Sequence, residues 1–247
     1  MHWLLPKLKG VRVLMYHHVW PNTSDSLTVT PQQLEEHFSY LKIHNYRTIP
    51  VSLLIDSMYS NRPLPENVII ITFDDGYRNQ IDFVEPLLKK YGFCACLFLV
   101  GEKVMSASDQ ANDVKESYLS VERINKADRQ YFEFGLHGYS HKALSQMTTE
   151  EFEADLILSK QVFSAMNISV APVFAYPYGD RSPDKEKMAQ IKGIMQACGI
   201  KAAFRIGNSA VSFPVKDRYE LKRIDITGFD NIKRFRIKLS KGKLKPF

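Results

Sequence analysis

The chain has 247 residues, a formal net charge of +6 and 45% hydrophobic residues. This length fits one large α/β domain or two small ones, and the apolar content excludes a disordered chain. The charge is uneven, because residues 233–247 hold seven Lys and Arg and no acid, which leaves 26 basic residues against 27 acidic ones elsewhere. With a nearly neutral body, the composition gives no reason to expect a nucleic-acid partner.

No stretch of the sequence is apolar over the length needed to span a bilayer, and the longest apolar run covers residues 93–100. The short run at residues 3–5 is interrupted at once by Pro6 and Lys7, so we do not identify it as a signal peptide. The three cysteines agree with a reducing compartment. We therefore expect a cytoplasmic protein whose basic tail, residues 229–247, either touches the inner face of the membrane or is solvated.

Strand and helix patterns alternate along almost the whole chain. Strands are expected at residues 11–16, 46–50, 68–73, 93–100, 132–136, 172–176, 202–205 and 221–226. Helices are expected at residues 51–58 and 79–91 and after the capping residues Thr30, Ser120, Thr148 and Ser182, whereas residues 101–117 predict a surface loop. This order predicts a single α/β domain with a largely parallel sheet or barrel.

The most informative strand is the one at residues 68–73, which runs directly into Asp74, Asp75 and Gly76. Its β-branched and aromatic residues show no polar alternation, which is typical of a strand buried on both faces. The two carboxylates then lie at the carboxyl end of an interior strand, where α/β sheets and barrels place their chemistry. Asp-Gly after a strand is also an ordinary turn signal, and this stretch alone slightly favours the turn.

A pair of histidines, His137 and His141, follows the expected strand at residues 132–136. If the segment turns helically, both rings project from one face and can share a metal ion. Surface or core histidines are the commoner explanation for such a pair taken alone. The pair nevertheless shares a rim with the two aspartates, and two histidines with one carboxylate form a three-ligand site with an open position, as in catalytic zinc sites.

Taken together, these motifs resemble the polysaccharide deacetylase family, also called the NodB-homology or carbohydrate esterase family 4 group. The resemblance rests on TFDDGY at residues 72–77 and on the spacing of His137 and His141. The flanking segments agree as well: EFGLH at residues 133–137 and FAYPYG at residues 174–179. The family implies a distorted (β/α) barrel and metal-dependent removal of N-acetyl groups from amino sugars. We assign residues 1–228 to this catalytic domain.

The resemblance also implies a role for each matching residue. Asp75, His137 and His141 would bind a divalent metal ion, with Zn²⁺ the expected ion. Asp74 would be the general base that takes a proton from the attacking water, and the backbone N–H of Tyr178 would help to hold the oxyanion. The expected substrate is an N-acylated amino sugar in a polysaccharide or glycan precursor.

The sequence departs from the family pattern in two places. Tyr176 occupies the position of the arginine that usually pairs with the catalytic base, so either Tyr176 or Arg223 would take over that task. No histidine follows His141, although the family usually places its general acid there. The segment MYHHV at residues 15–19 resembles the branch that deacetylates poly-N-acetylglucosamine, which implies that His17 protonates the leaving amine and that His18 is a bystander.

Two other functions deserve comparison. A phosphatase of the haloacid dehalogenase type also places Asp after a buried strand, but its two aspartates are separated by one residue, whereas Asp74 and Asp75 are adjacent. A non-catalytic carbohydrate-binding relative of the same fold is the second alternative, which the missing arginine and late histidine leave open. His37 and His44 lie on an expected helix, and we interpret them as packing or solvated residues. The sugar, the acyl group and the oligomeric state are not indicated.

Overall fold

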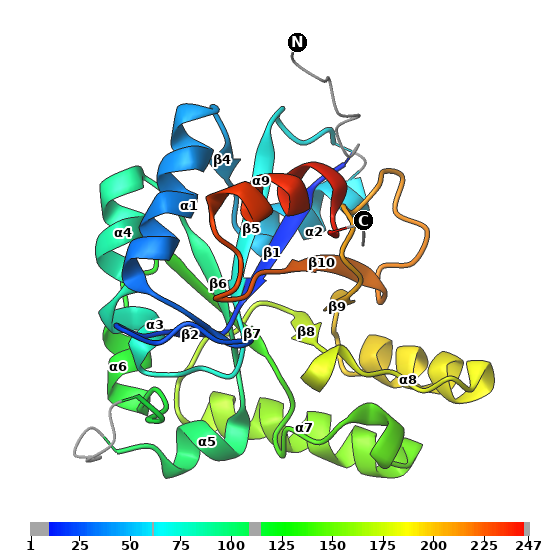
Figure 1. Cartoon of the computed structure of the whole chain (residues 1–247). Coiled ribbons are helices and arrows are strands. Elements are labelled where there is room, and N and C mark those ends of the chain that lie inside the picture. Colours follow the sequence, from blue (N-terminus) through cyan, green and yellow to red (C-terminus); the bar gives the residue numbers. More distant parts are fainter. Residues whose placement is uncertain (1–9, 61, 109–114, 245–247) are drawn as a thin grey trace.

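A computed structural model of the chain describes residues 10–60, 62–108 and 115–244 (Figure 1). The apolar run at residues 3–5 and the last residues of the basic tail lie outside these ranges. Within them, no helix is both long enough and apolar enough to cross a membrane.

Parallel strands close into a barrel, which confirms the expected distorted (β/α) barrel (Figure 1). The strands of this sheet are β1 (Arg12–Tyr16), β4 (Arg47–Thr48), β5 (Val68–Phe73), β6 (Ala95–Leu99), β7 (Phe132–Leu136), β8 (Val173–Ala175), β9 (Ala202–Ile206) and β10 (Leu221–Asp225). Strand β1 closes the barrel because it pairs with β10 on one side and with β5 on the other. The short β4 extends the sheet beyond β5, and β2 (His18–Val19) pairs with β3 (Thr28–Val29) outside the barrel.

Helices cover the outside of the barrel (Figure 1). They are α1 (Pro31–Ile43), α2 (Val51–Ser60), α3 (Asn79–Asp82), α4 (Val84–Tyr91), α5 (Gly101–Ser106), α6 (Val121–Lys126), α7 (Thr149–Ala165), α8 (Lys185–Ala197) and α9 (Ile232–Lys241). Single 3₁₀ turns, η1 and η2, cover Leu144–Gln146 and Pro177–Gly179. Both expected capping boxes are present, at Thr30 and at Thr148, and they explain where α1 and α7 begin.

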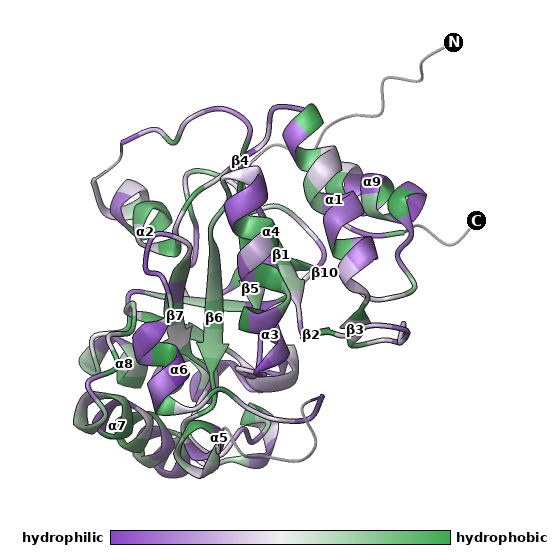
Figure 2. Ribbon diagram, turned by 90° about the vertical axis from the view of Figure 1, so that its left-hand side faces the viewer, coloured by the Kyte–Doolittle hydropathy of each residue, from purple (hydrophilic) through white to green (hydrophobic). Residues whose placement is uncertain are grey.

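The apolar side chains form two clusters that follow the alternation of the strands. In β5, Ile69 and Ile71 pack with the surrounding helices, whereas Ile70 packs with Phe98 and Phe204 inside the barrel. Strands β5 and β6 are therefore hydrophobic along their length, while the helices alternate between hydrophobic and hydrophilic residues (Figure 2). This packing leaves the carboxyl ends of the strands to carry polar side chains.

Two expected elements near the site differ from the structure. Residues 101–106 form helix α5 inside the segment expected to be a loop, because the sequence there has no apolar period long enough to show a helix. The helix expected at residues 79–91 is interrupted at Phe83, which separates α3 from α4. These differences matter for the site, since α3 follows the strand that ends at Asp74 and Asp75, and α5 donates hydrogen bonds to the loop between His137 and His141.

The basic segment at residues 229–247 is a packed part of the domain over most of its length. Its helix α9 buries Phe235 and Leu239 completely or nearly so, and Arg12 donates a hydrogen bond of 2.7 Å to the Leu239 carbonyl. Lys238 pairs with Asp230 at 2.5 Å. The expected domain boundary at residue 228 therefore does not separate a solvated tail from the barrel, because two apolar residues four apart bind the helix to it.

Candidate active site

Polar side chains converge at the carboxyl end of the barrel. His17 follows β1, Asp74 and Asp75 follow β5, and His137 follows β7, while Arg223 projects from β10. Four of these five side chains are buried, and His17 is only 14% exposed. Buried charged and titratable groups at this density are characteristic of a functional site.

The three expected metal ligands lie together. The donor atoms of Asp75, His137 and His141 are all within 4.8 Å of one another. Asp75 Oδ1 is 3.4 Å from His137 Nε2 and 3.1 Å from His141 Nε2. Tetrahedral zinc with bonds of about 2.0–2.1 Å holds neighbouring ligand atoms about 3.4 Å apart. These residues therefore fit a small divalent cation without rearrangement of the fold.

Hydrogen bonds orient the two imidazoles toward this point. The Nδ1–H of His137 donates to the Ala175 carbonyl at 2.8 Å, which leaves Nε2 to face Asp75. Burial lowers the pKa of His137, but the neighbouring Asp74 and Asp75 carboxylates outweigh it and raise the pKa. The buried His141 Nε2 faces Asp75 Oδ1 at 3.1 Å, but among the described residues it makes no hydrogen bond of good geometry. A cation would satisfy this nitrogen, since buried polar atoms are rarely left without a partner.

The loop that carries the histidine pair is not helical, so the expectation of a helical spacing is wrong. Gly138 and His141 have positive φ angles of 78° and 56°. The chain turns back on itself between the two histidines, and their ring centroids come within 4.9 Å. Glycine adopts such angles readily, but a histidine does so at a cost, which points to a conformation held by its surroundings.

Arg223 is the partner of Asp74. Its two terminal nitrogens each donate to one carboxylate oxygen at 2.6 Å, and the guanidinium is fully buried. Burial raises the pKa of Asp74, but Arg223 outweighs it and holds the pKa below its usual value. The Tyr176 hydroxyl instead donates to the Tyr219 carbonyl at 3.0 Å. Of the two residues left open by the sequence, Arg223 therefore pairs with the aspartate.

His17 faces the same carboxylate. Its Nε2 lies 4.0 Å from Asp74 Oδ2, and its Nδ1 is buried without a hydrogen bond among the described residues. His18 points elsewhere: its ring stacks on Tyr77 at 3.5 Å, and Asn79 donates to its Nδ1 at 3.1 Å. The structure thus places His17, and not His18, at the site.

Two buried amides that the sequence reasoning missed fix the strand ends. Gln80 donates to the carbonyl oxygens of His17 and Asp74. Asn79 accepts from the Val19 N–H at 3.0 Å. Both amides are fully buried on α3, directly after the aspartates. The polar run that follows Asp-Asp-Gly-Tyr was the only signal for them, and in sequence it resembles a solvated turn.

Tyr178 lies at the rim of the site on the turn η2. Its backbone has a positive φ of 60°, the residue is 66% exposed, and its ring centroid lies 4.7 Å from that of His141. The structure therefore places Tyr178 beside the metal ligands. The role of its backbone N–H stays a prediction.

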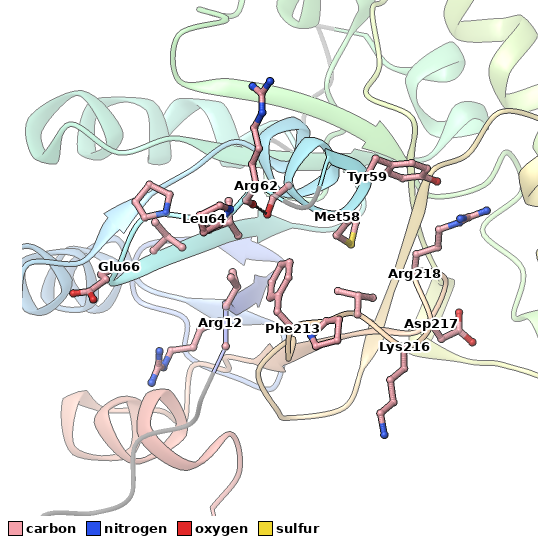
Figure 3. Close-up of a pocket in the computed structure, with 18 of the residues that line it drawn as sticks. Arg12, Met58, Tyr59, Arg62, Leu64, Glu66, Phe213, Lys216, Asp217 and Arg218 are labelled. Carbon is pink, nitrogen blue, oxygen red and sulfur yellow. Dashed lines mark hydrogen bonds between the residues drawn. The ribbon is translucent and has the colours of Figure 1, made fainter.

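A large cavity lies at the opposite end of the barrel (Figure 3). It has a volume of about 940 Å³ and lies between residues 57–68 and 213–219. Its lining includes Val11 and Val68, next to the amino ends of β1 and β5. None of the convergent carboxylates or histidines lines it. The chemistry is therefore assigned to the carboxyl end, where the reactive groups meet.

Comparison with known proteins agrees with this site. Residues 61–201, more than half of the chain, match the family model described as Polysaccharide deacetylase. The Bacillus subtilis protein YxkH is 25% identical over 181 residues, which cover 73% of this chain and 61% of YxkH. The poly-beta-1,6-N-acetyl-D-glucosamine N-deacetylase of Escherichia coli is 27% identical over 103 residues, 41% of this chain and 15% of that enzyme.

The Staphylococcus epidermidis protein of the same name is 25% identical over 206 residues, which cover 80% of this chain and 67% of that protein. Among solved structures, IcaB from Ammonifex degensii aligns with a TM-score of 0.78 at 20% identity, covering 96% of this chain and 98% of that one. The Streptococcus pyogenes deacetylase PplD aligns with a TM-score of 0.74 at 17% identity, covering 95% and 99%. These structural similarities establish the fold, and the match to the family model establishes the family. The chain belongs to the polysaccharide deacetylase family.

Proposed function

We propose that this protein is a metal-dependent hydrolase that removes the N-acetyl group from an amino sugar of a glycan. The observation that carries the proposal is the contact between two groups of residues: the Asp75, His137 and His141 cluster, and the Asp74–Arg223 pair beside it. One group fits a cation, and the other is a buried carboxylate that is ionised at neutral pH. Their proximity is what hydrolysis of an unactivated amide requires.

The cation would be held by Asp75 Oδ1 and by the Nε2 atoms of His137 and His141. Two imidazoles and a carboxylate form the donor set of many catalytic zinc sites, so Zn²⁺ is the ion we propose. When bound, the ion polarises the acyl carbonyl and lowers the pKa of a water molecule.

Asp74 is the proposed general base. Arg223 donates to both oxygens of its carboxylate. The Oδ2 atom also lies 3.9 Å from His137 Nε2 and 4.0 Å from His17 Nε2. That oxygen therefore faces the space between the metal ligands and the first strand. A water held there can give its proton to Asp74 as it attacks the acyl carbon.

His17 is the proposed general acid. It lies on the other side of the same space, in a chain that offers no histidine after His141. Protonation by an imidazole turns the leaving nitrogen into an amine, without which the carbon–nitrogen bond does not break at a useful rate. The backbone N–H of Tyr178 is the proposed donor to the oxyanion that forms during attack.

The proposed substrate class is N-acetylglucosamine in a polymer or a glycan precursor, supported by the names of the Escherichia coli and Staphylococcus epidermidis relatives. The location in the cell also stays a proposal. Three free cysteines favour the cytoplasm, where a nucleotide- or lipid-linked sugar would be the substrate. Recovery of the tagged full chain from the periplasm or the medium would contradict that location.

Acetate release tests the function. The zinc-reconstituted protein should release acetate from β-1,6-linked N-acetylglucosamine oligomers, and Asp74→Asn should lower kcat by about 10²–10⁴-fold, the range for a lost general base. A carbohydrate-binding relative without catalysis would bind the oligomers and release no acetate in either form. The zinc content of both proteins serves as the control, since Asp74 is not among the proposed ligands.

A further inference from the structure

The strained loop between the two histidine ligands is held by a carboxylate from a different element. Asp155, on α7, accepts a hydrogen bond of 2.7 Å from the Tyr139 N–H through Oδ2 and one of 2.9 Å from the Ser140 N–H through Oδ1. Both amides belong to residues between His137 and His141. Hydrogen bonds to an ionised carboxylate are about twice as strong as neutral ones, so the pair fixes the course of this loop.

The opposite side of the same loop is bound by the first residues of α5. The Gly101 N–H donates to the Gly138 carbonyl and the Glu102 N–H donates to the Tyr139 carbonyl, each at 3.0 Å. Helices α5 and α7 pack against each other below the barrel (Figure 1). The loop is therefore enclosed between them, with its carbonyls satisfied by one helix and its amides by the other.

Two glycines make this close fit possible. A Cβ at Gly138 would lie 3.0 Å from Asp155 Oδ2, and a Cβ at Gly101 would lie 2.9 Å from Tyr139 Cδ2. Because Gly138 has no side chain, it can adopt its positive φ angle and the Asp155 carboxylate can approach the loop. A side chain at either position would therefore displace the Asp155 carboxylate or the Tyr139 ring.

We propose that Asp155 is a positioning residue for the metal site, acting through the loop backbone to place His141 beside Asp75. The inference rests on the proposed function. His141 has a positive φ of 56°, a backbone conformation that is unfavourable for histidine without support from neighbouring groups. This conformation places its Nε2 3.1 Å from Asp75 Oδ1. Asp155 itself is not part of the ligand cluster, so its effect on the cation is transmitted through the backbone of Tyr139 and Ser140.

The test is the zinc affinity of the full chain, measured by competition with a chelator. Asp155→Ala should bind zinc about 10–100-fold more weakly, the range for outer partners of metal ligands. Asp155→Asn keeps one accepting oxygen and should lose less affinity than Asp155→Ala. Asp184→Ala is the matched control, because Asp184 also accepts from two backbone amides, Glu186 and Lys187, but does so at the start of α8.

The outcomes separate this inference from the proposed function. If the wild type binds zinc and both Asp155 variants bind it equally well, the positioning role is wrong and the function stands. If the wild type binds no zinc, the function is wrong, and amide hydrogen exchange decides the positioning role: Tyr139 and Ser140 must exchange faster in Asp155→Asn than in the wild type. Equal exchange rates, or an equal loss of zinc affinity in Asp184→Ala, would overturn the inference.

Discussion

Arg223 and Asp74 are 149 positions apart in the sequence and meet through two hydrogen bonds of 2.6 Å inside the barrel. Arg223 also donates to Thr72 at 3.2 Å, and its guanidinium lies 5.3 Å from the centroid of the Phe98 ring. The barrel thus supplies from β10 the positive charge that the family pattern usually places elsewhere. This pair fixes both the charge and the direction of the proposed base.

The planar fork of the guanidinium is the feature that Arg223→Lys removes. A lysine keeps the charge but cannot donate to both oxygens in one plane, so Asp74 would rotate. We expect kcat to fall by about 10–100-fold, with zinc content unchanged. The control is Arg205→Lys, because Arg205 forms an ion pair with Glu220 at 2.7 Å and does not contact Asp74. This variant should leave kcat within about twofold. Equal losses in the two variants would show that the bidentate contact is not specific to catalysis.

Removing the partner altogether should affect folding as well as rate. Arg223→Ala leaves the carboxylate of Asp74 buried and without its cation. Breaking a buried ion pair in this way costs about 3–5 kcal/mol, so we expect the urea midpoint to fall by about 1–1.5 M for an m value of about 3 kcal/mol/M. Arg223→Ala combined with Asp74→Asn should recover part of that loss. No recovery in the double variant would contradict the charge pairing as the cause.

The proposed role of His17 predicts a dependence on the leaving group. His17→Gln should lower the deacetylation rate of an N-acetylated sugar by about 10²–10⁴-fold, because the amine is no longer protonated. Hydrolysis of p-nitrophenyl acetate, whose leaving group needs no proton, should fall by less than about fivefold. His18→Gln is the neighbouring control. Parallel losses on the amide and on the ester would exclude an acid role for His17.

His37 predicts how stability depends on pH. Its ring stacks on Phe235 at 4.0 Å, Nε2–H donates to the Asp230 carbonyl, and the Tyr16 hydroxyl donates to Nδ1. Burial lowers the pKa of His37 to about 4, against a usual value of 6.5, although the Asp230 contacts act in the opposite direction. Between these values the unfolded chain binds the proton more readily than the folded one, so stability falls as the pH falls from 6.5 to about 4.

The full effect of that shift is about 3 kcal/mol. Chemical unfolding at several pH values from 4.5 to 7.5 should therefore show a steeper loss of stability in the wild type than in His37→Gln. His44→Gln is the control, since His44 is exposed at the end of the same helix. A slope that is the same in wild type and His37→Gln would mean that another group causes the acid sensitivity.

The basic residues of α9 allow a test of whether this helix contacts an anionic membrane surface. Deleting residues 229–247 would remove Phe235 and Leu239 from the core, so a change in vesicle binding could reflect unfolding. Reversing the charges of two exposed residues, Lys233→Glu and Arg236→Glu, avoids this. If α9 contacts an anionic surface, binding to phosphatidylserine vesicles should fall at least about 30-fold at low salt, at about 1 kcal/mol per basic residue. Unchanged binding would rule out this helix as the contact.

The sequence reveals what depends on local pattern. The buried run of β5 and the two aspartates after it are legible because six apolar residues precede them, and Thr148 with Glu151 marks the start of α7. The structure brings His137 and His141 beside Asp75, but not through a helical spacing, since the loop between them is not helical and makes hydrogen bonds with Asp155 and with the start of α5.

Long-range partners are not visible in this way. The sequence leaves Arg223 and Tyr176 as alternatives, because the choice depends on the closed barrel, in which β1 pairs with β10 and Arg223 contacts Asp74. Asn79 and Gln80 look solvated in sequence because polar residues usually are, yet both are fully buried. The packing of α9 was also missed, because its many lysines and arginines suggest a solvated segment. A count of charges does not show that Phe235 and Leu239 lie on one face of a helix.

Zinc stoichiometry is the measurement that tests the central claim most directly. The wild-type chain and His137→Ala are reconstituted with zinc, freed of excess ion and analysed for metal, with acetate release measured on the same samples. We expect about one zinc per chain and acetate release in the wild type, and the loss of both in His137→Ala. A wild type that releases acetate without bound metal, or a variant that keeps its zinc in full, would contradict this claim.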